Sequence, residues 1–338
     1  MNQKHLNFIC TELQLGTPHG DVTSVFGCRG GSFMWRVNTD KASYAIKQLA
    51  SMIDLKSERI INKYELSETI ACRFAQQGVQ AVSAIKKSGK HLNIIENTGY
   101  LIYPWVEGYT LGRHEISETH AFKIAELIAK LHNINLSVPE IVTPHVDIHS
   151  KDSIIEAIDR VISFKCPFAN ILNENQNLIL SMYDNYLAVV PLLLEDTVVT
   201  HGDIDQLNVL WNMQDQPVLI DWESVRKLNP TREIIRACLS WSGIGRDESS
   251  LPIYSNMLQT YIKSGRRLNL NHVNAALFSL VGSAVNWMLF NIKLACTTHV
   301  LEEKKQAEEE INSSVMAIKK SKIRIPELLS LSVKIADF

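Results

Sequence analysis

The apolar positions in the first hundred residues follow two different spacings. Residues 2–13 and 55–77 carry apolar side chains at helical spacing, and Gly78 predicts the end of the second helix. Shorter apolar or alternating runs predict strands at 22–26, 33–37, 42–49, 91–95 and 100–103. We therefore expect several short strands with one long helix in this part of the chain.

Helical spacing dominates from residue 117 onward. Ser117 is the expected N-cap of the first of these helices. The predicted helices are 117–133, 152–162, 174–192, one that starts at 228–234, 237–241, 251–264, 273–295, 301–318 and 326–335. Three short apolar runs interrupt the series and predict buried strands at 197–199, 209–211 and 218–220. The most apolar stretch, 275–296, contains serines, asparagines and a lysine, which favours a buried helix over a membrane span.

Composition narrows the class of protein. The 338 residues suffice for one large or two ordinary domains, and 46 % hydrophobic with 21 % charged residues indicates a globular chain. A formal net charge of −2 gives no bulk attraction to nucleic acid or to a membrane surface. Six scattered cysteines include no Cys-x-x-Cys pair, and no signal peptide is evident at the N-terminus. We therefore expect a cytoplasmic protein, a monomer or homodimer, without nucleic-acid or membrane partners.

Polar residues stand where the short strands end. Asp203 and Asn208 are separated by four residues, and Asp221 follows thirteen residues later, after an apolar run. Turns between strands are commonly rich in Asp and Asn. The spacing is also the one that phosphoryl transfer uses, with one carboxylate orienting the attacking hydroxyl and an amide oxygen and second carboxylate binding Mg²⁺. We predict Asp203 as the catalytic residue and Asn208 and Asp221 as the metal ligands.

The sequence around these residues, His201-Gly202-Asp203 with Asn208 and then Ile-Asp221-Trp-Glu, resembles the aminoglycoside phosphotransferase and choline kinase family. Members of this family are small-molecule relatives of the protein kinases. The resemblance implies an α+β bilobal protein-kinase-like fold with ATP and Mg²⁺ as cofactors. The N-lobe is expected at 1–104, with antiparallel strands and one long helix, and the mainly helical C-lobe at 105–338.

The resemblance also assigns nucleotide-binding residues in the N-lobe. Lys47 lies in an Ala-Ile-Lys strand that resembles the kinase strand carrying the phosphate-binding lysine. Glu68 is expected to pair with Lys47, and Glu65 is the alternative. Gly30 and Gly31 form a glycine-containing turn that can approach phosphates closely, although such a turn is more often simply a hairpin.

The segment Pro104-Trp105-Val106-Glu107-Gly108 resembles the adenine-binding hinge of the family. Proline has no amide hydrogen, so the Pro104 carbonyl is expected to accept from the adenine amino group. The Val106 amide is the expected donor to the ring. Trp105 either points away from the purine or covers it.

The acceptor side of the site is less defined. Asp205 replaces the lysine that protein Ser/Thr kinases carry there, so it either faces a small polar acceptor or is a solvated loop residue. We also predict Glu223 and Trp241 as acceptor contacts, Trp241 through a cation–π interaction or else as a core residue. His132 and His201 are expected to be structural, and Glu233 takes the place of an expected Asp that braces the catalytic loop.

The predicted function is therefore transfer of the γ-phosphoryl group of ATP to a hydroxyl of a small molecule such as an aminoglycoside-, choline- or homoserine-like acceptor. Two alternatives remain. A catalytically silent ATP-binding scaffold protein would retain the motifs without turnover. A protein kinase would need an activation segment, and the chain reaches Pro230 within nine residues of Asp221.

Overall fold

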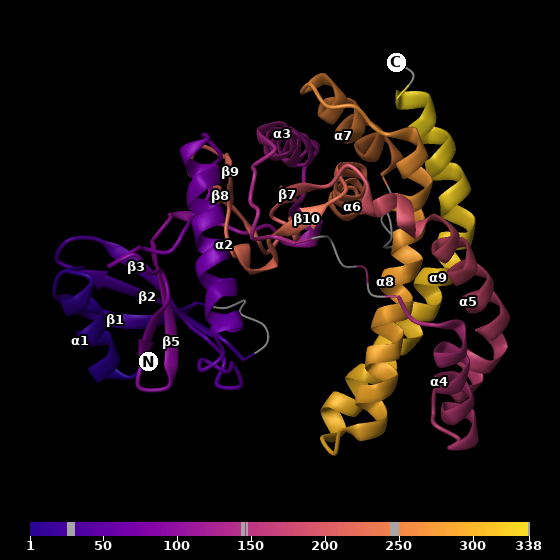
Figure 1. The fold of residues 1–338 in the computed structure, drawn as a ribbon, viewed down its shortest axis with the longest axis horizontal. Coiled ribbons are helices and arrows are strands. Elements are labelled where there is room, and N and C mark those ends of the chain that lie inside the picture. The colour runs from indigo at the N-terminus through magenta and orange to yellow at the C-terminus, as the bar shows by residue number, and fades with distance from the viewer. Residues whose placement is uncertain (26–30, 143–145, 147, 244–249, 337–338) are drawn as a thin grey trace. The chain divides into compact units, whose positions relative to one another are not determined.

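The computed structural model describes residues 1–25, 31–142, 146, 148–243 and 250–336. The chain divides into two compact units (Figure 1). The sheet unit comprises Met1–Ile116 and His201–Val225, and the helical unit comprises Ser117–Thr200 and Arg226–Phe338. The predicted lobe boundary at residue 104 groups residues 105–116 and 201–225 differently, and it stays a prediction.

The sheet unit is built on a five-stranded antiparallel sheet in the order β1-β2-β3-β5-β4. The strands are β1 (Pro18–Val25), β2 (Phe33–Thr39), β3 (Ser43–Gln48), β4 (Asn93–Ile95) and β5 (Thr98–Pro104), and the helices are α1 (Gln3–Glu12) and α2 (Glu58–Gln76). These elements confirm the predicted antiparallel strands with one long helix.

Alternation along the strands separates two hydrophobic clusters. Tyr100 and Ile102 of β5 pack in a cluster with Ile46 and with Leu6 of α1. Leu101, the residue between them, packs instead with Tyr64 of α2. Successive strand residues point to opposite faces of a sheet, so the two helices cover opposite faces. Lys47 follows Ile46 and therefore points away from the α1 cluster.

Helix α2 ends as the glycine predicts. Gly78 adopts a left-handed conformation with φ of 81°, and its amide donates to the Ala75 carbonyl over 2.9 Å. The Val79 amide donates to the Phe74 carbonyl over 3.0 Å. Both hydrogen bonds belong to the Schellman motif, which satisfies the last carbonyls of the helix. The turn leads directly to residues 80–82, which pair with Leu219.

A second, three-stranded sheet in the order β6-β8-β9 completes the sheet unit. Its strands are β6 (Gly108–Tyr109), β8 (Val209–Asn212) and β9 (Pro217–Leu219), followed by the 3₁₀ helix η3 (Trp222–Ser224). The loop 201–208 precedes β8, and Asp221 follows β9. The two predicted strands at 209–211 and 218–220 are thus paired neighbours, which brings the ends of their flanking loops together.

The helical unit contains most of the long helices. They are α3 (Glu118–Ile134), α4 (Lys151–Ser163), α5 (Ala169–Val189), α6 (Pro230–Trp241), α7 (Leu251–Lys263), α8 (Leu270–Thr297) and α9 (Leu301–Ala336). Short elements accompany them: η2 (Val190–Leu194) and the two-stranded sheet of β7 (Val198–Thr200) with β10 (Arg226–Leu228), while η1 (Arg113–Glu115) ends the first segment of the sheet unit. Ser117 caps α3 as predicted, by accepting from the His120 amide.

The prediction of two C-terminal helices at 301–318 and 326–335 is wrong, because α9 is one helix that continues through Pro326. Proline lacks the amide that would continue the hydrogen-bond ladder. Burial offsets this loss, since Ile325 and Leu328 on either side of Pro326 are 4 % and 1 % exposed. Helix α9 runs alongside α8 (Figure 1), and this packing holds the chain helical across the proline.

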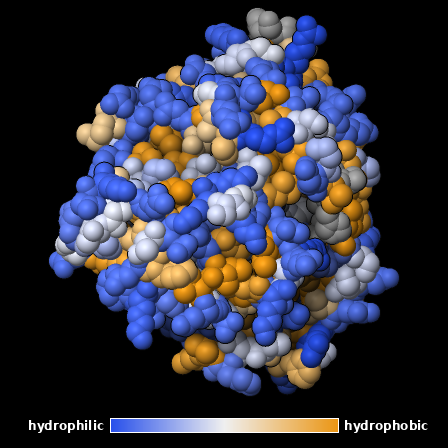
Figure 2. Space-filling view, turned by 60° about the vertical axis from the view of Figure 1, so that its left-hand side comes forward, coloured by the Kyte–Doolittle hydropathy of each residue, from blue (hydrophilic) through white to orange (hydrophobic). Residues whose placement is uncertain are grey.

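Two described segments, Ala169–Leu194 and Leu270–Thr297, are long and apolar enough to cross a membrane by length and composition alone. The core helix of a soluble protein passes the same test, and 56 % of the apolar window of α8 is buried inside the structure. On the face drawn in Figure 2, hydrophobic residues appear in small groups between hydrophilic ones.

Candidate active site

Lys47 is a buried, positively charged residue in strand β3 of the sheet unit. Its side chain is 8 % exposed, and its Nζ lies 3.0 Å from Asp221 Oδ1 and also contacts Glu223 Oε1. Burial alone lowers the pKa of Lys47, but the two carboxylates outweigh it and raise the pKa above the ordinary value of 10.5. Lys47 is therefore held as a charged ammonium beside the Asp221 carboxylate.

The expected pairing of Lys47 with Glu68 or Glu65 is wrong for the described structure. Glu68 accepts instead from the Ala84 amide over 2.6 Å and from the Tyr103 hydroxyl over 2.8 Å. Glu65 accepts from the His91 and Leu92 amides. Glu68 is 1 % exposed, and this burial raises its pKa to about 7, against the lowering influence of its hydrogen bonds and of Lys47. A direct role of Glu68 in cofactor binding stays a prediction.

Asp203 and Asn208 are joined across their loop. The Asn208 side-chain amide nitrogen donates to the Asp203 carbonyl over 2.9 Å and to Asp203 Oδ2 over 3.1 Å. Asp205 Oδ1 accepts from the Leu207 amide over 2.9 Å, an Asx-turn that shapes the loop between them. Both hydrogens of the Asn208 amide thus have a partner, which directs its oxygen away from Asp203 as a ligand requires.

His201 holds the loop at Asp203 through hydrogen bonds at both ring nitrogens. Its Nε2 donates to the Ile220 carbonyl over 2.8 Å, and its Nδ1 accepts from the Asp203 amide over 3.4 Å. The ring is fully buried and packs edge-on against Trp222 at 4.7 Å. One imidazole therefore ties the loop at Asp203 to Ile220, the residue before Asp221. This agrees with the predicted structural role of His201.

Asp221 itself adopts a left-handed backbone conformation, with φ of 59° and ψ of 67°. Few residue types other than Gly, Asn and Asp enter this region readily. The Ile220 amide donates to the Asn208 carbonyl over 3.1 Å. The two predicted metal ligands, one just before β8 and one just after β9, therefore lie at the same end of these paired strands. The Asp221 side chain is 44 % exposed and is accessible to a ligand.

A cavity of about 690 Å³ lies within the sheet unit over these residues. Lys47, Asp203, Asp205, Asn208, Asp221 and Glu223 line it, together with apolar side chains and the hinge segment: Val25, Met34, Ala45, Val82, Leu210, Ile220, Pro104, Trp105 and Val106. Apolar walls with a few polar groups at one end are typical of nucleotide-sized ligand sites. The structure therefore brings the predicted site residues to one cavity, namely Lys47, Asp203, Asp205, Asn208, Asp221, Glu223, Pro104 and Val106.

The hinge is held by close backbone contacts. The Trp105 amide donates to the Ser43 carbonyl over 3.1 Å, and Arg36 lies over the Trp105 ring at 4.5 Å. A Cβ atom on Gly108 would lie 2.5 Å from the Trp211 carbonyl oxygen, so β6 can approach β8 only with glycine there. Gly31 has φ of 81°. Gly30 lies outside the described residues.

The residues fit a nucleotide-bound Mg²⁺ rather than a metal held by protein alone. No group of three or more His, Cys, Asp or Glu side chains that could hold a metal occurs among the residues that the structure describes. Mg²⁺ is usually bound by one or two carboxylates together with phosphates and water. Asp221 and the Asn208 amide oxygen supply that kind of donor set, and their role as ligands stays a prediction.

The acceptor predictions fare differently. Trp241 is 1 % exposed in α6, so its indole is a core side chain in this structure and the prediction that it contacts the acceptor is not supported.

Glu233 accepts from His132 Nε2 over 2.8 Å, and His132 Nδ1 lies 2.8 Å from the Tyr261 hydroxyl. His132 is structural as expected, and Glu233 forms a buried network within the helical unit.

Sequence reasoning missed two features of this site. The sequence suggests Glu223 only as an acceptor contact, whereas it binds Lys47. Tyr103 lines the cavity and bonds Glu68. Strand alternation carries the signal for part of the lining, because Ala45 and Lys47 share one face of β3 and Met34 pairs with Lys47 in register.

Comparison with known proteins identifies the family. The model of the phosphotransferase enzyme family matches residues 69–262, which include the hinge, the loop at Asp203 and Asp221. The chain belongs to the phosphotransferase enzyme family. The family resemblance predicted from the residues around Asp203 is confirmed by this match. The family is one of small-molecule phosphotransferase enzymes. No curated protein sequence matches the chain significantly.

Solved structures of phosphotransferases share the fold. Spectinomycin phosphotransferase in complex with ADP and spectinomycin is 13 % identical, with 95 % of this chain and 98 % of that chain covered and a TM-score of 0.68. Plasmodium vivax ethanolamine kinase is 16 % identical, with 94 % and 91 % covered and a TM-score of 0.57. Choline kinase from Streptococcus pneumoniae is 14 % identical, with 93 % and 99 % covered and a TM-score of 0.57. The predicted kinase-like α+β fold is confirmed.

Proposed function

We propose that this phosphotransferase-family protein moves the γ-phosphoryl group of ATP to a hydroxyl group of a small molecule in a Mg²⁺-dependent reaction. The observation that carries the proposal is the single cavity lined by Lys47, Asp203, Asn208 and Asp221. A hinge segment and apolar side chains line the remainder of that cavity, as an adenine ring requires. We also retain a cytoplasmic location as part of the proposal.

Each polar residue has a distinct task in this reaction. Lys47 contributes a positive charge to the ATP phosphates, since its pKa keeps it protonated. Asp203 orients the acceptor hydroxyl and takes its proton late in the transfer, because a loose phosphoryl transition state needs little early proton abstraction. Asn208 and Asp221 would hold Mg²⁺, which would neutralise charge on the phosphate oxygens.

The acceptor is a small molecule with an accessible hydroxyl group, of the aminoglycoside-, choline- or homoserine-like kind. Besides Asp203 and the metal ligand Asp221, the cavity presents two acidic side chains, Asp205 and Glu223. Glu223 is committed to Lys47, which leaves Asp205 at the cavity wall as the proposed contact for a polar or cationic acceptor. The overall charge of −2 does not favour a polycationic aminoglycoside in particular.

The test is Mg²⁺-dependent ADP release from ATP across a panel of amino alcohols, aminoglycosides, amino acids and sugars. One acceptor class should stimulate release, and both Asp203→Asn and Asp221→Asn should abolish that stimulation. Glu65→Gln, on α2 and outside the cavity lining, is the matched control and should retain it. Failure of the wild-type protein to bind Mg-ATP would overturn the proposal, and Mg-ATP binding without turnover of any acceptor would favour the ATP-binding scaffold alternative.

A further inference from the structure

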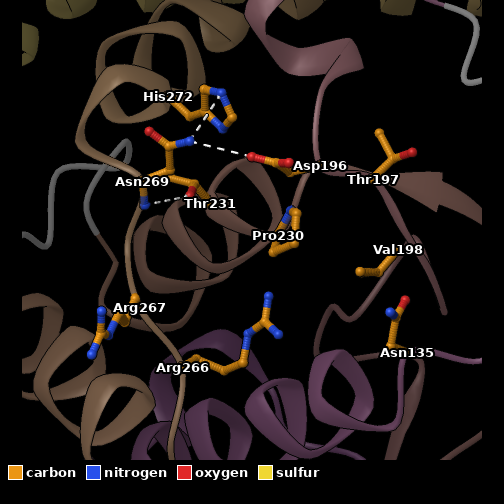
Figure 3. Close-up of a pocket in the computed structure, with 10 residues that line it drawn as sticks. All are labelled: Asn135, Asp196, Thr197, Val198, Pro230, Thr231, Arg266, Arg267, Asn269 and His272. Atoms are coloured by element: carbon orange, nitrogen blue, oxygen red, sulfur yellow. Dashed lines mark hydrogen bonds between the residues drawn. The ribbon is translucent and has the colours of Figure 1, made fainter.

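A second cavity, of about 380 Å³, is made entirely of residues from the helical unit. It lies among the start of β7, the N-terminus of α6 and the segment between α7 and α8 (Figure 3). Its lining residues are Asn135, Asp196, Thr197, Val198, Pro230, Thr231, Arg266, Arg267, Asn269 and His272. Polar side chains dominate this set, and none of them belongs to the candidate active site.

Arg266 is the charged group that reaches into this cavity. Figure 3 shows its side chain extending toward Pro230 into the middle of the lining residues, whereas Arg267 extends away from them. The Arg266 Nε is buried and has no hydrogen-bond partner. The guanidinium also contacts two neutral groups. Its Nη1 donates a long hydrogen bond of 3.4 Å to the His132 carbonyl, and the guanidinium bonds the Tyr261 hydroxyl. Among the described carboxylates, none forms an ion pair with Arg266.

The geometry around Arg266 favours an anion. A buried guanidinium N–H without a partner, here at Nε, is costly, and an oxyanion is a well-matched ligand for it. Pro230 and Thr231 are the first residues of the twelve-residue helix α6, whose N-terminal end adds positive potential at the same place. Val198 and Pro230 give this part of the cavity an apolar wall, which strengthens a charge interaction there.

The opposite side of the cavity offers hydrogen-bond acceptors. Asp196 Oδ2 accepts from the Asn269 side-chain amide over 3.4 Å, a long bond that leaves most of the carboxylate available. Asp196 is exposed, so a ligand can reach the cavity from solvent. A second anionic group would be repelled there, whereas a hydroxyl or amino group would be bound.

We propose that this cavity binds a small anionic molecule, with its phosphate, sulfate or carboxylate group at Arg266 and a hydroxyl or amino group at Asp196. The inference does not depend on the proposed phosphotransfer reaction, because no residue is shared between the two sites. Inorganic phosphate is the simplest probe of the Arg266 end.

The experiment is isothermal titration of the full-length protein with potassium phosphate, at constant ionic strength maintained with chloride. Saturable binding is expected in the wild type. Arg266→Gln should weaken it about tenfold or more, the loss expected for a charge-assisted hydrogen-bonded pair. Arg267→Gln removes the same charge from the neighbouring residue and is the matched control, with a change of less than about twofold.

Two further variants test whether the phosphate occupies this cavity or the active site. Asp196→Asn should tighten phosphate binding severalfold, because it removes a repelling charge, and a gain of affinity cannot come from misfolding. Lys47→Ala alters the active site alone, and phosphate binding should persist in it. Loss of binding in Lys47→Ala with retention in Arg266→Gln would overturn the proposal. Equal weakening by Arg266→Gln and Arg267→Gln, or no saturable binding by the wild type, would overturn it as well.

Discussion

Glu68 makes the stability of the sheet unit depend on pH. Its carboxyl group is 1 % exposed, and burial raises its pKa from 4.5 to about 7 in the folded protein. Between these two pH values the folded state keeps the proton that the unfolded chain has lost. The free energy of unfolding therefore has its full Glu68 contribution below pH 4.5 and falls as pH rises toward about 7.

The size of this effect follows from the pKa difference. A shift from 4.5 to about 7 is about 2.5 units, and each unit corresponds to about 1.4 kcal/mol. The Glu68 contribution to the free energy of unfolding should thus decrease by about 3 to 4 kcal/mol between the two ends of the range. Burial is almost complete, so solvent screening does not reduce this figure substantially.

Urea unfolding of the wild type and of Glu68→Gln at about pH 5 and about pH 8 measures the effect. The wild type should lose about 3 kcal/mol more than the variant over this interval. Glu65→Gln is the control on the same helix, and it should keep the wild-type pH dependence because Glu68 is still present. The reasoning is refuted if Glu68→Gln shows the same pH dependence as the wild type.

Three further predictions concern the site and the helical packing. Asp203→Asn should lower acceptor-dependent turnover by about a hundredfold to ten-thousandfold while ATP affinity, measured by calorimetry, stays within about twofold; a large loss of affinity would contradict the role assigned to Asp203. In Glu223→Gln the pKa of Lys47 should fall, because the larger of its two stabilising charges is gone, and an unchanged Lys47 titration by NMR would count against the ion pair. Gly282→Ala should lower the free energy of unfolding by about 1–3 kcal/mol in urea titrations, since its Cβ would lie 2.5 Å from Cε1 of the buried Tyr186 ring; an equally stable variant would show that the two helices separate easily.

Periodicity in the sequence predicts most of the elements but not where a helix breaks. The strands and helices of both units follow the apolar spacing, because burial of one face fixes the local conformation. Pro326 is the exception. A local rule ends a helix near proline, whereas the packing of Ile325 and Leu328 decides otherwise. Tertiary contacts of this kind cannot be read from a single sequence.

The site divides in the same way between local and long-range information. Asp203, Asn208 and Asp221 are recognisable because their spacing along the chain is itself the signal, and one cavity brings them together. The partner of Lys47 was not predictable. Glu223 stands 176 residues away in the sequence, two residues after the left-handed backbone turn at Asp221. The position of Trp241 in the helical pattern is compatible with either a core or a cavity side chain. Only the packing of the surrounding helices determines which of the two it is.

The hydrogen bonds of His201 bear on whether ATP is hydrolysed when no acceptor is bound. The contacts described for Asp203 come from His201 and Asn208, within its own loop, and none requires an alcohol to be bound. A carboxylate oriented in this way serves water as readily as an alcohol. Slow hydrolysis of ATP without an acceptor is therefore an expected side reaction, limited only by how well the site excludes water. Its rate is the background that the rate with a true acceptor must exceed.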